Sequence, residues 1–136
     1  MQFRYKGINL FAFSDTHGLH NALHIPADTD ILICAGDAVE DNLDPADYRA
    51  FIDWFRQQPG ELKFFVPGNH ELWTTPKDPV QMHGAARYEY LVAMCRDLDV
   101  VTPEDPFPVW TGSGAEKYGG RVTIAPMFLL YDYSWL

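Results

Sequence analysis

The chain has 136 residues, enough for one domain at most, and 47% of them are hydrophobic, so it can bury a core without disulfide bonds. Its formal net charge of -9 at pH 7 argues against nucleic acid or an anionic membrane as a partner, because phosphate groups attract clusters of Lys and Arg. No apolar run approaches the roughly 20 residues that a membrane span needs.

The sequence carries no sign of export. Its first six residues lack the apolar core of a signal peptide. The two cysteines, Cys34 and Cys95, lie in apolar patterns, where buried and reduced thiols are the usual state. We therefore expect one cytoplasmic domain over residues 1–136.

Three short apolar runs are typical of buried strands. They cover residues 8–14, 30–35 and 62–66. The second run is almost uninterrupted, as in a parallel sheet that is covered on both faces. Helical patterns lie between and after the runs, and strands that alternate with helices form right-handed βαβ units. We therefore predict the α/β class with a mostly parallel sheet.

Two longer amphipathic helices are predicted. Asp44 and Pro45 form a helix-start signal, with Asp as the N-cap and Pro at the first helical position. The apolar residues that follow recur at i, i+3, i+4 and i+7, which places them on one helix face: Tyr48, Phe51, Ile52 and Phe55. A second helix with the same spacing is expected over residues 85–98.

The remaining segments are predicted to be less regular. A short helix is expected at residues 19–23, and two prolines within residues 72–82 favour a loop over the site. A short strand would follow at residues 99–101. Residues 107–111 and 121–125 look like the two arms of a β-hairpin that glycines join.

Polar residues follow each of the three strands where the strand ends. They are Ser14-Asp15-Thr16-His17-Gly18, Gly36-Asp37 and Gly68-Asn69-His70-Glu71. Ligands of α/β proteins bind beyond the carboxyl ends of parallel strands, so we expect these residues to form one site. Imidazole, carboxylate and amide ligands together suit Mn, Fe, Zn or Ni better than Mg or Ca. Asp and His after one strand are often turn or cap residues, but three such endings favour a metal site.

These motifs resemble the signature of the calcineurin-like metallophosphoesterases, D-x-H, G-D and G-N-H-[D/E], in the same order and with similar gaps. The resemblance covers about residues 8–128, and Tyr131-Asp132-Tyr133-Ser134 is also similar to bacterial members. It implies an α/β/β/α sandwich with a mostly parallel sheet and flanking helices. It also implies hydrolysis of a small phosphomonoester or phosphodiester by a hydroxide that two divalent metal ions activate.

The resemblance implies a role for each matching position. Asp15 and His17 would bind the first metal ion, Asp37 would bridge the two ions, and Asn69 would bind the second. His70 would not be a metal ligand. It would lie beside the substrate phosphate and either stabilise the charge that develops or protonate the leaving alkoxide.

Residues next to the motifs have alternative roles. Glu71 would orient His70 or the loop. Glu40, in the acidic loop after Asp37, would form hydrogen bonds behind the ligands or stay a solvated loop charge. Trp73 would stack on a ring of the substrate or pack within its own loop.

The sequence departs from the family after His83, because it has neither the later lone histidine nor the G-H-x-H motif. The chain is then the N-terminal part of a longer protein, a half-size member that takes ligands from a partner chain, or a degenerate relative that holds one metal ion or none. The intact residues of the three motifs favour the first, a truncated sandwich. Such a chain leaves an apolar sheet face unburied, so we expect homodimers or aggregation through that face, or a loosely ordered C-terminus.

The residues after the second motif narrow the range of possible activities. Phosphoprotein phosphatases of the family carry G-D-x-V-D-R-G, whereas residues 36–42 contain no Arg. The pattern favours a small bacterial-type phosphodiesterase or a general phosphohydrolase. The rival hypothesis is a non-catalytic or single-metal binding domain on the same fold.

Overall fold

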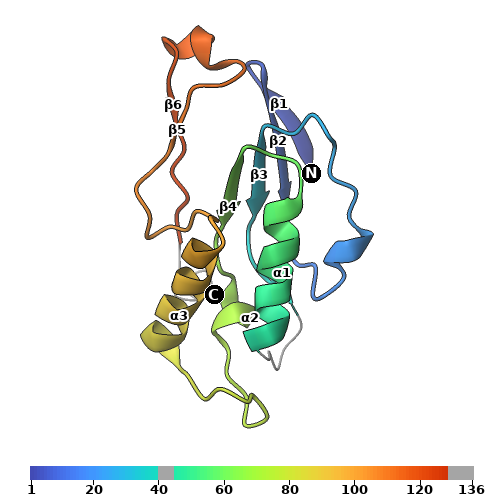
Figure 1. Ribbon diagram of the computed structural model, residues 1–136, viewed down its shortest axis with the longest axis vertical. Coiled ribbons are helices and arrows are strands. Elements are labelled where there is room, and N and C mark those ends of the chain that lie inside the picture. The colour runs from blue at the N-terminus through green and yellow to red at the C-terminus, as the bar shows by residue number, and fades with distance from the viewer. Residues whose placement is uncertain (40–44, 129–136) are drawn as a thin grey trace, which may run out of the picture.

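The computed structural model describes residues 1–39 and 45–128 of the chain (Figure 1). The predicted N-cap Asp44, the candidate site residue Glu40 and the stretch at residues 131–134 lie outside these described residues. Within the described part, every helix is too short or too polar to span a lipid bilayer.

The central sheet has four strands, in the order β1 (Gln2–Tyr5), β2 (Ile8–Phe13), β3 (Ile31–Cys34) and β4 (Leu62–Phe65). Strands β2, β3 and β4 are parallel, whereas β1 is antiparallel to β2. The register pairs Phe13 with Cys34 and Cys34 with Phe65, so the three parallel strands end at one edge of the sheet. The predicted α/β class and mostly parallel sheet are confirmed.

Strand β1 is not among the predicted elements. The chain passes from β1 to β2 through a two-residue turn, because Tyr5 pairs with Ile8. Both turn residues have positive φ, 48° at Lys6 and 96° at Gly7, the conformation that suits twisted hairpins. All residues of β1 are exposed. The strand therefore has no apolar run, and the Lys-Gly turn is the signal that reveals it.

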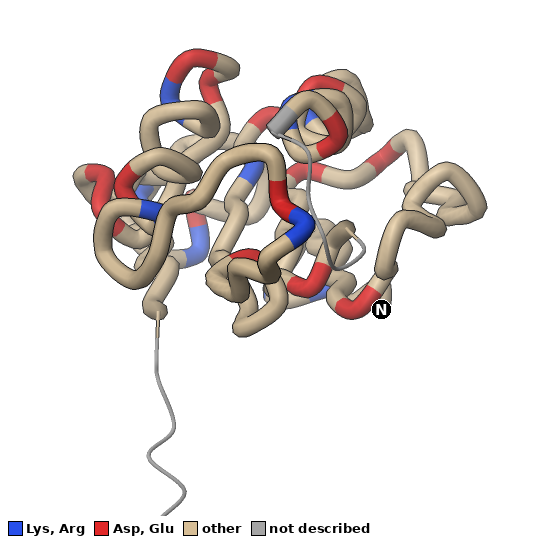
Figure 2. Tube along the Cα trace, turned by 90° about the horizontal axis from the view of Figure 1, so that it is seen from below, with Lys and Arg blue, Asp and Glu red and all other residues tan. Residues whose placement is uncertain are grey.

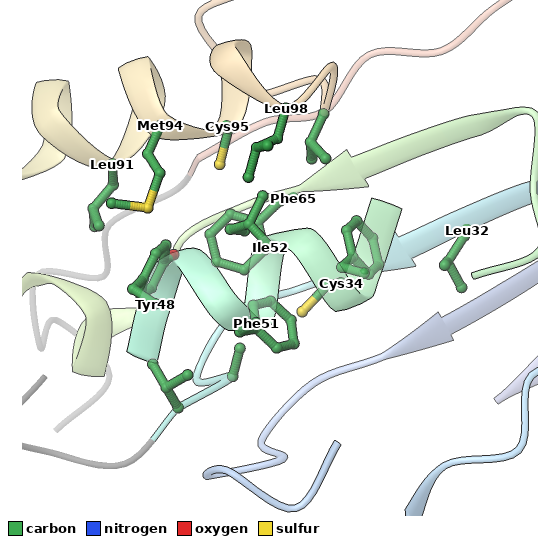
Figure 3. Packing of buried hydrophobic residues seen from close by; sticks show 14 of the residues in the cluster. Leu32, Cys34, Tyr48, Phe51, Ile52, Phe65, Leu91, Met94, Cys95 and Leu98 are labelled. Atoms are coloured by element: carbon green, nitrogen blue, oxygen red, sulfur yellow. The ribbon is translucent and has the colours of Figure 1, made fainter. Parts of the chain in front are cut away.

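Two helices cover one face of the sheet. α1 (Pro45–Gln57) and α3 (Gly84–Asp97) confirm the two predicted amphipathic helices, and α1 runs along the sheet in Figure 1. Their apolar faces pack on strand residues that include Leu32, Cys34 and Phe65. Figure 3 shows side chains of α1, α3 and the strands turned toward one another in this main core.

Both cysteines are free and buried in this main core, as predicted. Burial raises the pKa of the Cys34 thiol, and it raises the pKa of Cys95 to about 12. Thiols with raised pKa values stay protonated and unreactive at neutral pH. The two cysteines therefore act as small apolar residues of the core.

The opposite face of the sheet is covered in part. A hairpin of β5 (Val109–Trp110) and β6 (Val122–Thr123), with the 3-10 helix η2 (Ala115–Tyr118) between its strands, contributes Trp110 to a second core on this face. The hairpin is confirmed over a shorter span than predicted. Several apolar residues on this face stay half-buried, and they are Leu10, Ile33, Leu62 and Val101.

Three predicted elements differ in the structure. The short helix after the first motif is one 3-10 turn, η1 (His20–Ala22). The strand expected at residues 99–101 is reduced to a single bridge between Phe64 and Val101, because Asp99 has a φ of 56°, which an extended strand excludes. The third motif runs into a short helix, α2 (Asn69–Leu72), before the predicted loop.

Phe51 is expected to carry a large share of the stability. Its fully buried ring stacks on Phe55 with centroids 5.9 Å apart and meets Phe65 at the same distance. Phe51→Ala should lower the free energy of unfolding by about 3–5 kcal/mol, measured by urea denaturation. Phe107→Ala, at a side chain that is 49% exposed, should change it by less than about 0.5 kcal/mol. Equal effects of the two substitutions on the free energy of unfolding would contradict the role of Phe51 in the core.

The half-buried face predicts association of two copies. Gel filtration with light scattering should give a mass above the 15.5 kDa of one chain at raised protein concentration. The apparent mass should fall on dilution, because the hairpin already covers part of the face and leaves less of it for the interface. A monodisperse monomer at every concentration would be the contrary result.

Candidate metal centre

Backbone hydrogen bonds bring the first two motifs together where β2 and β3 end. The N–H of Asp15 donates to the carbonyl oxygen of Gly36 at 3.0 Å, and the N–H of His17 donates to that of Asp37 at 3.1 Å. Deeper in the sheet, the N–H of Val66 donates to the carbonyl oxygen of Cys34 at 2.9 Å, which continues the ladder into the third segment. The three strand endings therefore form one continuous surface.

Three candidate ligands have backbones in the left-handed region that non-glycine residues seldom adopt. The φ angles are 54° at Asp15, 42° at His17 and 51° at Asp37. Such residues cost of order 1–3 kcal/mol each and persist where surrounding contacts fix them, typically at functional sites. Here the backbone bonds between the motifs provide those contacts.

Two motif glycines allow the second and third motifs to touch. A Cβ atom on Gly68 would lie 2.2 Å from Oδ1 of Asp37, and one on Gly36 would lie 2.2 Å from the backbone nitrogen of Gly68. Neither distance is compatible with a side chain larger than hydrogen. The glycines of the motifs are therefore required by close approach of the two loops.

Three side chains converge at this edge. One potential ligand atom from each of His17, Asp37 and His70 lies within 4.8 Å of the others. The ring centroids of His17 and His70 are 4.9 Å apart. The backbone N–H of His70 donates to Oδ1 of Asp37 at 3.0 Å. Two imidazoles and a carboxylate at this spacing fit a transition-metal ion.

The other predicted ligands lie beside this group. Asp15 is exposed, and its carboxylate accepts a hydrogen bond from the hydroxyl of Ser14. Asn69 is the exposed first residue of α2, next to His70. Among the described residues, the converging group thus contains His70, which was expected to face substrate, and does not contain Asp15. The ligand roles of Asp15, His17, Asp37 and Asn69 stay predictions.

Glu71 lies beneath the metal-type ligands and is 0% exposed. Its two carboxylate oxygens accept backbone N–H bonds from Asp37 at 2.8 Å, Ala38 at 2.7 Å and Gly68 at 2.6 Å. Burial raises the pKa of the Glu71 carboxyl, and the three N–H donors act against that rise. The side chain thereby ties the second motif to the third.

Arg87 is a residue of this region that the sequence interpretation missed. It is 7% exposed on α3, and its Nε donates to the carbonyl oxygen of Glu71 at 2.6 Å. It also forms a buried ion pair of 3.6 Å with Asp78 in the loop after α2. A signal was present, because Arg87 lies four residues before Leu91 on the apolar stripe of the predicted helix, where a charge needs a partner.

Comparisons with known proteins place nearly the whole chain among related sequences and structures. The sequence matches the family described as calcineurin-like phosphoesterase over residues 8–132. It is 48% identical over 134 residues to the [Acyl-carrier-protein] phosphodiesterase PptH of Mycobacterium tuberculosis, covering 93% of this chain and 39% of that protein. The crystal structure of Phosphopantetheinyl Hydrolase (PptH) from the same organism matches with a TM-score of 0.77 and 46% identity, over 96% of this chain and 46% of that chain.

The chain thus spans less than half the length of the relatives to which it is similar. Within that span, the family match covers all three motifs and the three parallel strands β2, β3 and β4 that carry them. The solved neighbour and the observed sheet and helices confirm the predicted α/β fold with a mostly parallel sheet, whereas the full α/β/β/α layering stays a prediction. The chain belongs to the calcineurin-like phosphoesterase family.

Proposed function

We propose that this chain hydrolyses a phosphodiester at the edge where β2, β3 and β4 end, with divalent metal ions bound there. The observation that carries the proposal is the convergence of His17, Asp37 and His70, whose potential ligand atoms lie within 4.8 Å of one another. The name of the Mycobacterium tuberculosis relative, a phosphodiesterase, supports this ester class over a phosphomonoester.

The motif residues divide the work of binding and proton transfer. His17 and Asp37 hold metal, with Asp15 and Asn69 as the further ligands, and the set suits two ions of Mn, Fe, Zn or Ni. Bound divalent ions supply positive charge for the phosphoryl oxygens and lower the pKa of water. His70 donates a proton to the leaving alkoxide or joins the ligands, because its half-buried ring lies beside that of His17, with centroids 4.9 Å apart.

The substrate that we propose is a phosphodiester attached to a protein rather than a small free ester. The relative is named for an acyl carrier protein, and its structure for phosphopantetheinyl hydrolysis. Figure 2 views the edge where the strands end, and in it Lys and Arg are scattered among Asp and Glu rather than gathered in a patch. This charge pattern argues against nucleic acid as the substrate. A cytoplasmic location stays a prediction.

Asp37→Asn should reduce hydrolysis of bis(p-nitrophenyl) phosphate by at least about 100-fold in the presence of manganese. The change removes the carboxylate charge that would hold metal but keeps the size of the side chain. His70→Ala should also reduce kcat, and EDTA should abolish activity that added manganese restores. Release of p-nitrophenolate measures all three effects.

Asp97→Asn, on the exposed last residue of α3, is the matched control and should leave activity unchanged. The same variants should then be tested on a phosphopantetheinyl carrier protein, with mass spectrometry to detect loss of the phosphopantetheine. Absence of hydrolysis together with absence of bound metal would overturn the proposal and favour the non-catalytic binding domain.

Glu71→Gln tests how the two motifs are held together. An amide has one acceptor oxygen, so its NH2 group would face at least one of the three backbone N–H donors. We expect the free energy of unfolding to fall by about 1–3 kcal/mol, measured by urea denaturation. Glu116→Gln, at an exposed position of η2, should have almost no effect. Equal stability of the two variants would refute this role.

A further inference from the structure

Trp73 is the exposed aromatic residue beside the candidate metal centre. Its side chain is 51% exposed, although the free energy of burying an indole is large. Its ring contacts the imidazole of His70, with centroids 4.2 Å apart and planes at 39°. The imidazole of His70 in turn lies 4.9 Å from that of His17. The indole thus contacts one member of the converging group directly.

We propose that Trp73 is a specificity-determining residue that contacts a planar group in the organic part of the substrate, such as an amide, while the phosphate occupies the metal centre. The inference rests on the proposed function. A single exposed aromatic residue on a protein surface is ordinary. The position of this one is not, because it shares a ring contact with His70 and is held there by its loop.

The loop that carries Trp73 is folded upon itself. The backbone N–H of Trp73 donates to the carbonyl oxygen of His70 at 3.2 Å, which closes the end of α2. The hydroxyl of Thr74 donates to the carbonyl oxygen of Met82. The carboxylate of Asp78 accepts the backbone N–H of Thr75 at 2.7 Å. These bonds give the backbone on both sides of Trp73 a defined shape.

Arg87 fixes this loop to α3. Its guanidinium donates to the carbonyl oxygen of Glu71 at 2.6 Å and to the hydroxyl of Thr74 at 3.2 Å, and it pairs with buried Asp78 at 3.6 Å. Glu71, two residues before Trp73, and Thr74, directly after it, are therefore both bound to the same buried cation. An aromatic side chain held in advance loses little entropy when a ligand stacks on it.

The chemistry of the indole indicates the group that it recognises. A flat π surface favours stacking with another planar group, and removing one stacking ring commonly weakens binding about tenfold. A ligand that carries a methyl group on its phosphorus instead of a ring offers no planar surface for stacking. Trp73 should therefore distinguish ligands by their organic part and should be indifferent to the phosphoryl part.

The test compares phenylphosphonate with methylphosphonate, two ligands that share the phosphonate and differ in the planar ring. Isothermal titration calorimetry in the presence of zinc gives both dissociation constants. The protein should bind phenylphosphonate about tenfold more tightly than methylphosphonate. Trp73→Ala should remove this preference and leave the Kd of methylphosphonate within about twofold, whereas Trp73→Phe should retain most of it.

Phe107→Ala, at an exposed aromatic residue outside the motif segments, is the matched control and should keep the preference. A separate assay of methyl p-nitrophenyl phosphate hydrolysis reports the proposed function. If Trp73→Ala weakens both phosphonates equally, or if the wild type shows no preference or no binding, the inference is overturned. If the wild type prefers phenylphosphonate but does not hydrolyse methyl p-nitrophenyl phosphate, the proposed function alone is rejected.

Discussion

The candidate site depends on one buried carboxylate. Glu71 is removed from water, and a carboxylate in that position destabilises a fold unless donors surround it. Its donors are backbone N–H groups of Asp37, Ala38 and Gly68. All three hydrogen bonds satisfy the charge, and the two from Asp37 and Ala38 also join the second motif to the third. They also account for α2, because the chain must turn helically after Gly68 for the Glu71 side chain to reach back to the N–H of that residue.

These hydrogen bonds bring the backbones of the second and third motifs close together. This close approach explains which residue types the motifs contain. With the loops drawn together, a Cβ on Gly68 would collide with Asp37, so glycine is required there. The positive φ values of His17 and Asp37 turn their side chains at the point where an extended backbone would continue away from the edge. Strain in the backbone and the absence of a Cβ thus serve one purpose, which is to bring imidazole and carboxylate within a few ångströms.

The parts of the fold that carry periodic apolar patterns could be predicted from the sequence. The α1 stripe and the apolar runs of β2, β3 and β4 are direct consequences of burial, and Phe51 and Cys34 lie in the core as their positions indicate. Strand β1 has no buried residue and gives no such pattern. The convergence of the strand endings follows from the parallel order, but the nearness of His70 to His17 depends on the turn into α2. A four-residue helix set by one hydrogen-bonded carboxylate leaves no periodicity to read.

The position of His70 connects the chemistry of phosphate to the recognition of the rest of the ester. One neighbour of its ring is His17, a candidate ligand, and another is the exposed indole of Trp73. The imidazole of His70 therefore contacts both the candidate ligand and the indole. The backbone of that segment is held from below by the carboxylate of Glu71 and from the side by Arg87 of α3. Both supports belong to the helix-covered side of the sheet. The geometry of this edge is therefore determined by the main core, and the hairpin on the opposite face contributes none of these contacts.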